Sequence, residues 1–109
     1  MQIQITARHC ELPSSIQARA EELMERLRRV EPRAARAEII FQEERHLKLA
    51  EGIVVVDGEE PTVARGEGSD FRAALDQMSD RLRRMLRRRR ERVRDHQGPS
   101  ASEVASSDV

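Results

Sequence analysis

The hydrophobic pattern of this chain changes its period several times, and these changes constrain the fold more than any other feature. Residues 2–8 alternate between polar and apolar side chains, which is typical of a half-buried strand. From residue 14 to 30 apolar side chains recur at helical spacing, and Ser14 and Gln17 have the spacing of a capping box. The pattern therefore predicts a strand and then a helix, which ends before Pro32.

Three further extended segments follow this helix. Residues 37–43 alternate in polarity, and residues 48–56 are rich in β-branched side chains, as strands are. Asp57-Gly58 favours a hairpin turn, so residues 61–65 are expected to form the fourth strand. Pro61 predicts that this strand lies at an edge of the sheet, because proline cannot donate a hydrogen bond to a neighbouring strand.

The last periodic segment predicts a second, longer helix. Residues 66–69 are expected to break the fourth strand, and either Ser69 or Asp70 is a suitable helix cap. Apolar side chains then recur at helical spacing from Phe71, and we expect the helix to continue to about Arg94.

This order of elements predicts an α+β fold, in which two helices cover one face of a four-stranded sheet in the order β-α-β-β-β-α. The first strand is expected to lie parallel to the second, and the last three strands to form an antiparallel meander. A chain of 109 residues suits one core, so residues 1–97 are expected to form a single domain. Residues 98–109 are small and polar, which predicts a disordered tail.

The charges are strongly segregated, although the formal net charge of the chain is zero. Residues 1–80 hold 11 basic and 16 acidic side chains, a net charge of −5. Residues 81–97 hold nine arginines against two acidic side chains, a net charge of +7. A short basic segment on an otherwise acidic chain indicates one surface for a polyanion, and it lies on the second helix.

A rotation of 100° per residue divides these arginines between two flanks of the helix. One flank holds Arg81, Arg84, Arg88 and Arg92, and the other holds Arg83, Arg87, Arg90 and Arg94. Arg89 falls on the apolar face, so we expect packing to end near Leu86 and the last turns to project beyond the sheet. A solvated helix with a basic end that suits the helix dipole is the alternative, but four adjacent arginines would repel one another in it.

Arginines of the first helix are candidates for extending the basic surface. Arg26 and Arg29 lie beside the expected buried stripe of that helix. Glu22 lies among them, so a solvated amphipathic helix is an equal alternative.

Catalytic, metal and membrane functions find little support in the sequence. His9, His46, His96 and the single cysteine, Cys10, are not spaced as a metal site or a nucleophile and base, so we expect no enzyme, cofactor, metal or small-molecule substrate. No apolar run is long enough to span a membrane and the N-terminus does not resemble a signal peptide, so a cytoplasmic protein is expected. With only two aromatic residues, folded RNA is a more suitable ligand than a stacked single strand.

Two segments resemble the ribosome hibernation promoting factor family, which includes the ribosome-associated inhibitors. The first is the opening MQIQITARH, residues 1–9. The second and more specific is EGSDFRAALD, residues 67–76, followed by Asp80-Arg81-Leu82, which is similar to the start of the last helix in that family. The family has the element order expected here, and the resemblance covers about residues 1–95.

The resemblance implies a translation inhibitor of stress or stationary phase, which binds 16S-type rRNA of the small ribosomal subunit in the channel used by mRNA and tRNA. Basic family positions correspond to Arg81, Arg84 and Arg88, and further ones to Arg26 and Arg29. Where the family commonly alternates lysine with polar residues, this chain has four arginines at 87–90. The candidate rRNA-binding residues are therefore Arg81, Arg84, Arg87, Arg88, Arg92, Arg26 and Arg29.

Long family members add a second, dimerising domain, for which residues 98–109 leave no room, so a monomer is expected away from the ribosome. The sequence does not decide between promoting ribosome pairing and keeping single ribosomes inactive. Two other classes stay open. One is a general RNA- or DNA-binding module, and the other is a protein-interaction domain whose basic helix meets an acidic partner.

Overall fold

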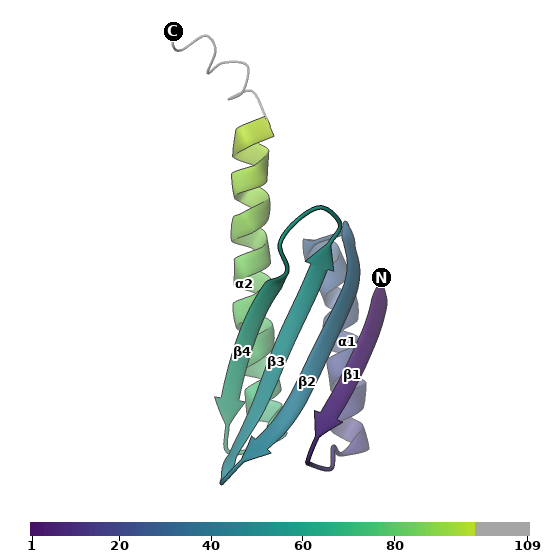
Figure 1. The fold of residues 1–109 in the computed structure, drawn as a ribbon, viewed down its shortest axis with the longest axis vertical. Coiled ribbons are helices and arrows are strands. Elements are labelled where there is room, and N and C mark those ends of the chain that lie inside the picture. Colours follow the sequence, from purple (N-terminus) through teal and green to yellow (C-terminus); the bar gives the residue numbers. More distant parts are fainter. Residues whose placement is uncertain (98–109) are drawn as a thin grey trace, which may run out of the picture.

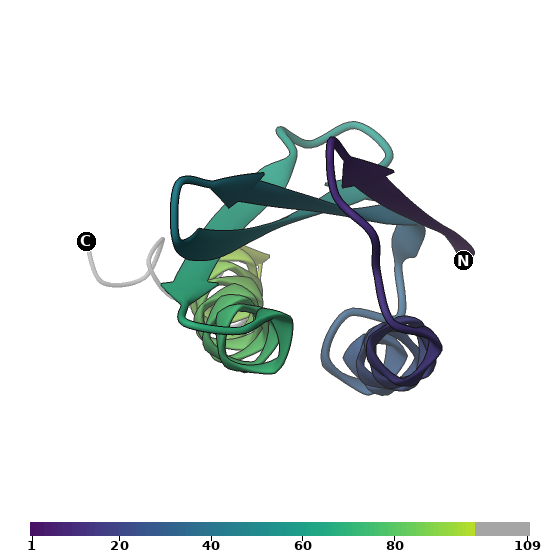
Figure 2. The ribbon, with the colours of Figure 1, turned by 90° about the horizontal axis from the view of Figure 1, so that it is seen from below.

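The six elements of the fold follow the periods of the sequence. The computed structural model describes residues 1–97, so the disordered tail expected at 98–109 lies outside the described residues. The elements are β1 (Gln2–Arg8), α1 (Ser14–Val30), β2 (Ala34–Glu44), β3 (Leu47–Val56), β4 (Thr62–Gly68) and α2 (Phe71–Gln97). Both helices lie on one face of the sheet and leave the other face open (Figure 1 and Figure 2). The predicted α+β architecture is confirmed.

The sheet has the strand order β1-β2-β3-β4. β1 is parallel to β2, with Ile5 opposite Ile39, while β2, β3 and β4 are antiparallel to one another in turn. Both pairings agree with the expected topology. β4 is an edge strand, as Pro61 predicted, and α2 packs along it.

The core lies between the sheet and the two helices. Because strand side chains alternate, Ile39 and Phe41 of β2 face the helices and are fully buried. The rings of Phe41 and Phe71 meet edge to face, with centroids 5.6 Å apart and planes at 87°. Helix α2 contributes a stripe of side chains that are at most 1% exposed: Ala74, Leu75, Met78, Leu82 and Leu86. This stripe fixes which side of α2 faces the sheet.

The expected break of the fourth strand at residues 66–69 is wrong, because β4 continues to Gly68. Gly66 is needed there for a close approach of α2. A Cβ atom at Gly66 would lie 2.3 Å from the Ala74 carbonyl oxygen and 2.4 Å from the Met78 backbone nitrogen. Glycine therefore seats the helix against the edge strand.

The helix starts are capped in different ways. The capping box predicted at Ser14 and Gln17 does not form. Instead the Pro13 carbonyl accepts hydrogen bonds from the N–H groups of Ile16 and Gln17, at 3.0 and 3.1 Å. Asp70 caps α2 as predicted, because its Oδ1 accepts a hydrogen bond from the Ala73 N–H at 2.8 Å.

The strand boundaries differ from the predicted ones at the loops. β2 begins at Ala34 rather than at residue 37, and its pairing with β3 shifts register between Ala34 and Arg36. The hairpin predicted at Asp57-Gly58 is confirmed, but its loop covers residues 57–61. Gly58 has a φ of 83°, which suits glycine.

Candidate nucleic-acid interface

Helix α2 has two flanks, and the fold gives them different neighbours. One flank borders β4, where the Gln77 Oε1 accepts a hydrogen bond from the Glu67 N–H at 2.9 Å. The other flank borders α1, where Arg19 Nε donates to Asp76 Oδ1 at 2.9 Å. Figure 2 shows the two helices side by side beneath the sheet. Arginines on the two flanks of α2 therefore belong to different surfaces.

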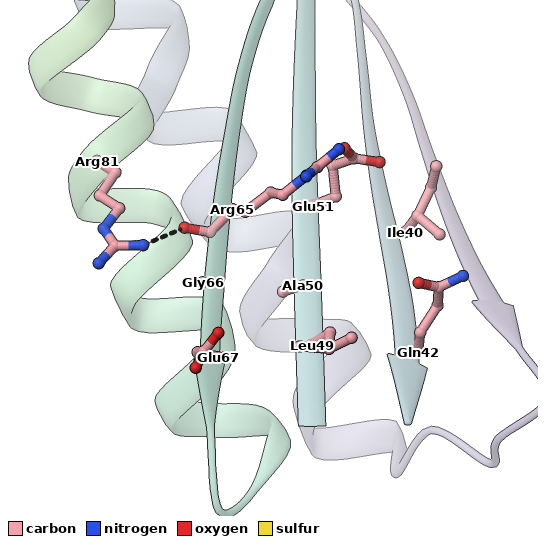
Figure 3. A pocket seen from close by; sticks show the side chains of 9 residues that line it. All are labelled: Ile40, Gln42, Leu49, Ala50, Glu51, Arg65, Gly66, Glu67 and Arg81. Atoms are coloured by element: carbon pink, nitrogen blue, oxygen red, sulfur yellow. Dashed lines mark hydrogen bonds and ion pairs between the residues drawn. The ribbon is translucent and has the colours of Figure 1, made fainter. Parts of the chain in front are cut away.

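Arg81 is exposed but is partly engaged by the fold. Its Nη1 donates a hydrogen bond to the Arg65 carbonyl oxygen at 2.8 Å, which ties α2 to the edge of β4 (Figure 3). The side chain is exposed, and a guanidinium group has further N–H donors beyond the one used in this bond. Arg81 thus has a structural contact in addition to any contact with RNA.

Figure 3 also shows the side chains that line a pocket beside this contact, which reaches onto the open face of the sheet. The volume of this pocket is about 410 Å³. Glu51 and Glu67 line it together with Arg65 and Arg81, and Arg65 Nε lies 2.9 Å from Glu51 Oε2. The charges in this pocket therefore compensate one another, and the pocket does not suit a polyanion.

Arg84, Arg87 and Arg88 form a group of exposed candidate residues on α2. Within the described part of the chain, none of the three has an ion pair or a hydrogen bond from its side chain. Uncompensated guanidinium groups at a surface are suited to binding phosphate oxygens in pairs.

Arg89 is directed into the fold, which corrects the expectation that packing ends near Leu86. Its Nη1 donates to the Glu60 carbonyl oxygen at 2.5 Å and to the Thr62 Oγ1 at 2.6 Å. Its Nε lies 3.6 Å from Glu59 Oε1, and the side chain is 23% exposed. An arginine at an apolar helix position is accommodated because the loop before β4 offers it oxygen acceptors.

Glu59 links Arg89 to Arg33, which in turn binds the buried Glu31. Glu59 Oε1 is buried without a hydrogen bond, and its other oxygen lies 3.0 Å from Arg33 Nη1. Arg33 also forms two side-chain hydrogen bonds, both at 3.1 Å, to Glu31, whose side chain is 2% exposed. Burial raises the pKa of Glu31, but the hydrogen bonds from Arg33 and the charges of Arg33 and Arg90 outweigh it, so the pKa lies below its ordinary value.

Arg90 completes the attachment of the helix, because its Nη1 donates to the Val30 carbonyl oxygen at the end of α1 at 2.9 Å. The four adjacent arginines are thus divided into two pairs. Arg89 and Arg90 are hydrogen-bonded to the rest of the domain, whereas the exposed side chains of Arg87 and Arg88 have no partner among the described residues. The last turns of α2 extend beyond the sheet, as expected (Figure 1).

Glu59→Gln is expected to lower the free energy of unfolding by about 1–2 kcal/mol, because it leaves Arg33 and Arg89 without their shared carboxylate. Glu60→Gln is the matched control, since the exposed neighbouring side chain has no contact of its own in the described residues and only its backbone carbonyl binds Arg89. Urea denaturation of both variants measures the difference. Equal stabilities would show that the Glu59 carboxylate does not hold α2.

Arg26 and Arg29 lie by the other flank of α2. Arg26 Nη2 is 3.2 Å from Glu22 Oε2, a pairing that fits the alternative of a solvated amphipathic helix. Arg29 is exposed. Arg26 lines a hollow of about 240 Å³ between the helices with Arg83 and Asp80. The structure therefore brings Arg83 beside the α1 arginines, although Arg83 is outside the candidate set. The sequence placed Arg83 on the flank of the helix opposite to Arg81, and this position could have indicated that it lies near the arginines of α1.

Arg92 and Arg88 line a separate groove of about 440 Å³ between α2 and the start of β4. The structure thus spreads the candidate residues around the exposed half of α2. Arg88 and Arg92 face the β4 side, while Arg26 and Arg29 lie on the α1 side.

Metal sites and membrane-spanning helices were sought among the described residues. The described side chains, those of residues 1–92, include no group of three His, Cys, Asp or Glu that is arranged to hold a metal ion. No helix within residues 1–97 has both the length and the apolar character that crossing a membrane requires.

The fold and this surface define a class of protein: a small β-α-β-β-β-α domain whose last helix carries exposed arginines along the sheet. Residues 3–94 match the family model described as sigma 54 modulation protein / S30EA ribosomal protein. The chain therefore belongs to this family, in agreement with the resemblance seen in its sequence.

Two solved structures share the fold. A ribosomal subunit interface protein from Coxiella burnetii gives a TM-score of 0.77 at 20% sequence identity, over 84% of this chain and 99% of that one. The N-terminal domain of Protein Y from Thermus thermophilus gives 0.69 at 26% identity, over 81% and 98%. No curated protein matches the sequence significantly.

Proposed function

We propose that this protein binds the small ribosomal subunit through 16S-type rRNA and keeps ribosomes inactive in stress or stationary phase. Its site would be the channel used by messenger RNA and by the anticodon ends of transfer RNA, and it would act in the cytoplasm. The observation that carries the proposal is the exposed, uncompensated group Arg84, Arg87 and Arg88. The chain belongs to a family whose description names a ribosomal protein.

The chemistry of the surface favours phosphates of folded RNA. Both aromatic rings are in the core, with Phe41 fully buried and Phe71 7% exposed, so neither is available for stacking on bases. Guanidinium groups at the surface can each take two phosphate oxygens, and such contacts release counterions from the RNA. Binding to the subunit should therefore weaken steeply with salt.

Inhibition would follow from exclusion and not from a reaction. Helix α2 has 27 residues and is about 40 Å long, so its basic end can reach among rRNA phosphates while the sheet and α1 fill neighbouring space. A monomer bound in this way needs no cofactor and no turnover. The effect should be stoichiometric and reversible.

Added protein is expected to prevent initiator tRNA from binding a small subunit that carries messenger RNA. When the subunit concentration is well above the Kd of the protein, half of the inhibition should be reached near one protein per two subunits. Filter binding of labelled tRNA measures this. A nuclease would act at far lower ratios and leave cut RNA, which gel electrophoresis would detect. Simultaneous binding of both with undiminished affinities would rule out exclusion.

A general RNA- or DNA-binding module is the second candidate, since arginine-phosphate contacts carry no sequence information. Sedimentation of a lysate from starved cells through a sucrose gradient separates the two. Protein in the ribosomal fractions supports the first candidate. Protein at the top of the gradient, with equal affinity for ribosomal and unrelated RNA, supports the second.

A further inference from the structure

The groove between β4 and α2 combines exposed apolar side chains with arginines in its lining. It is formed by Pro61, Thr62, Val63, Met85, Arg88, Arg89 and Arg92. Val63 and Met85 are 40% and 38% exposed, and among the described residues only Leu47 is another large hydrophobic side chain of that exposure. Two of the three exposed large hydrophobic side chains thus meet in one groove.

The charges of this groove have one sign. Three arginines line it and no carboxylate does, and although Arg89 is paired with Glu59 behind the wall, Arg88 offers its charge to a ligand. By contrast, Asp76 and Asp80 line the hollow between the helices, and Glu51 and Glu67 line the pocket on the open face of the sheet. A ligand of this groove should therefore combine negative charge with an apolar surface.

The walls of the groove differ in rigidity. Arg89 is fixed by the Glu60 carbonyl and the Thr62 hydroxyl, so it forms a preorganised inner wall. Arg88 is exposed and has no partner within the described residues, so it is available to an incoming anion. The apolar side chains of Val63 and Met85 border these cations.

The strand edge adds polar groups to the groove. Alternate residues of an edge strand direct both their N–H and C=O groups to the same side. The Arg65 carbonyl and the Glu67 N–H are bound by Arg81 and Gln77 of α2, so odd-numbered residues face that side. By the same alternation the backbone N–H and C=O groups of Val63 lie on this edge, where they can pair with the polar edge of a base.

The geometry points to this groove as a subsite for one unpaired nucleotide of a folded RNA, with the base against Met85 and Val63 and a phosphate at Arg88. Nucleotides supply a flat apolar face, a hydrogen-bonding edge and a charge, which are the three features that the groove offers. Its volume of about 440 Å³ is within the range of small-ligand sites. This subsite rests on the proposed function and names a contact within it.

The test uses the double variant Met85→Gln and Val63→Gln, with Leu47→Gln as the control at similar exposure at the start of β3. The probes are a fluorescein-labelled six-nucleotide single-stranded RNA and the same strand with abasic sites. We expect the double variant to bind the intact strand about 10-fold more weakly than the wild type, and Leu47→Gln to bind it equally well. Abasic RNA should bind wild type and double variant alike.

The salt dependence distinguishes the base contact from the phosphate contact. Arg88→Gln should reduce the slope of log K against log salt by about 1, whereas the double variant should leave the slope unchanged. Equal binding of intact and abasic RNA by the wild type would overturn the subsite. So would an acidic peptide that competes for the groove and binds it more tightly than the RNA does.

Sedimentation with purified small subunits separates this inference from the proposed function. Subunit binding by the wild type, with no loss in the double variant, would refute the subsite and leave the proposed function standing. Groove-dependent binding of the free strand without binding to subunits would refute the proposed function and support the subsite. Circular dichroism confirms that the variants fold, and each single substitution can replace the double one.

Discussion

Replacing Arg84, Arg87 and Arg88 together by glutamate is expected to reduce affinity for the small ribosomal subunit by at least about 100-fold, because each arginine–phosphate contact becomes a repulsion. Arg81 is left unchanged because its bond to the Arg65 carbonyl oxygen supports the fold. All three side chains are exposed, so the variant should fold with near wild-type stability. Cosedimentation at two salt concentrations measures the loss.

The matched control for this experiment is the triple variant Arg8→Glu, Arg36→Glu and Arg45→Glu. It changes the net charge equally, and its side chains are exposed on β1, on β2 and in the turn after β2. We expect it to lose much less affinity than the α2 variant. Equal losses in both variants would mean that net charge, and not the basic surface of α2, governs binding.

Gly66→Ala is expected to lower the free energy of unfolding by about 3 kcal/mol, the upper end of the usual cost of overpacking. The added methyl group would meet the Ala74 carbonyl oxygen and the Met78 nitrogen, which are backbone atoms of α2 and cannot rotate away. Relief would require α2 to move off β4 and would open the core around Met78. Urea denaturation measures the change.

Gly58→Ala separates this packing effect from the general effect of replacing a glycine. A Cβ atom there meets nothing within 4 Å, and the cost comes only from the φ of 83°. That cost should be about 1 kcal/mol. A Gly66→Ala variant as stable as Gly58→Ala would show that the approach of α2 to β4 relaxes easily.

The period of the hydrophobic pattern determined the elements and their order. Alternation in β1 and helical spacing in α1 predicted both elements with the bounds that the structure has. The parallel pairing of β1 with β2 followed from the helix between them. These features were readable because burial of one face imposes a period on the chain.

Local rules failed where a tertiary contact decided the outcome. Gly66 was expected to break β4, because the sequence does not show that a helix 8 to 12 residues later packs on that glycine. The capping box at Ser14 was expected from spacing alone, but the Pro13 carbonyl and the entering chain supply the first turn.

By itself the sequence determined that positive charge is concentrated on α2 and which arginines share a flank, since both depend only on composition and helical rotation. Only the tertiary structure separated the arginines at 87–90 into a pair without partners among the described residues and a pair hydrogen-bonded to the rest of the domain. The acceptors of Arg89 and Arg90 come from the loop before β4 and from the end of α1, at least 27 residues away in the chain. Contacts of that separation have no periodic signal, because they depend on how the helix and the loops are placed after the core has formed.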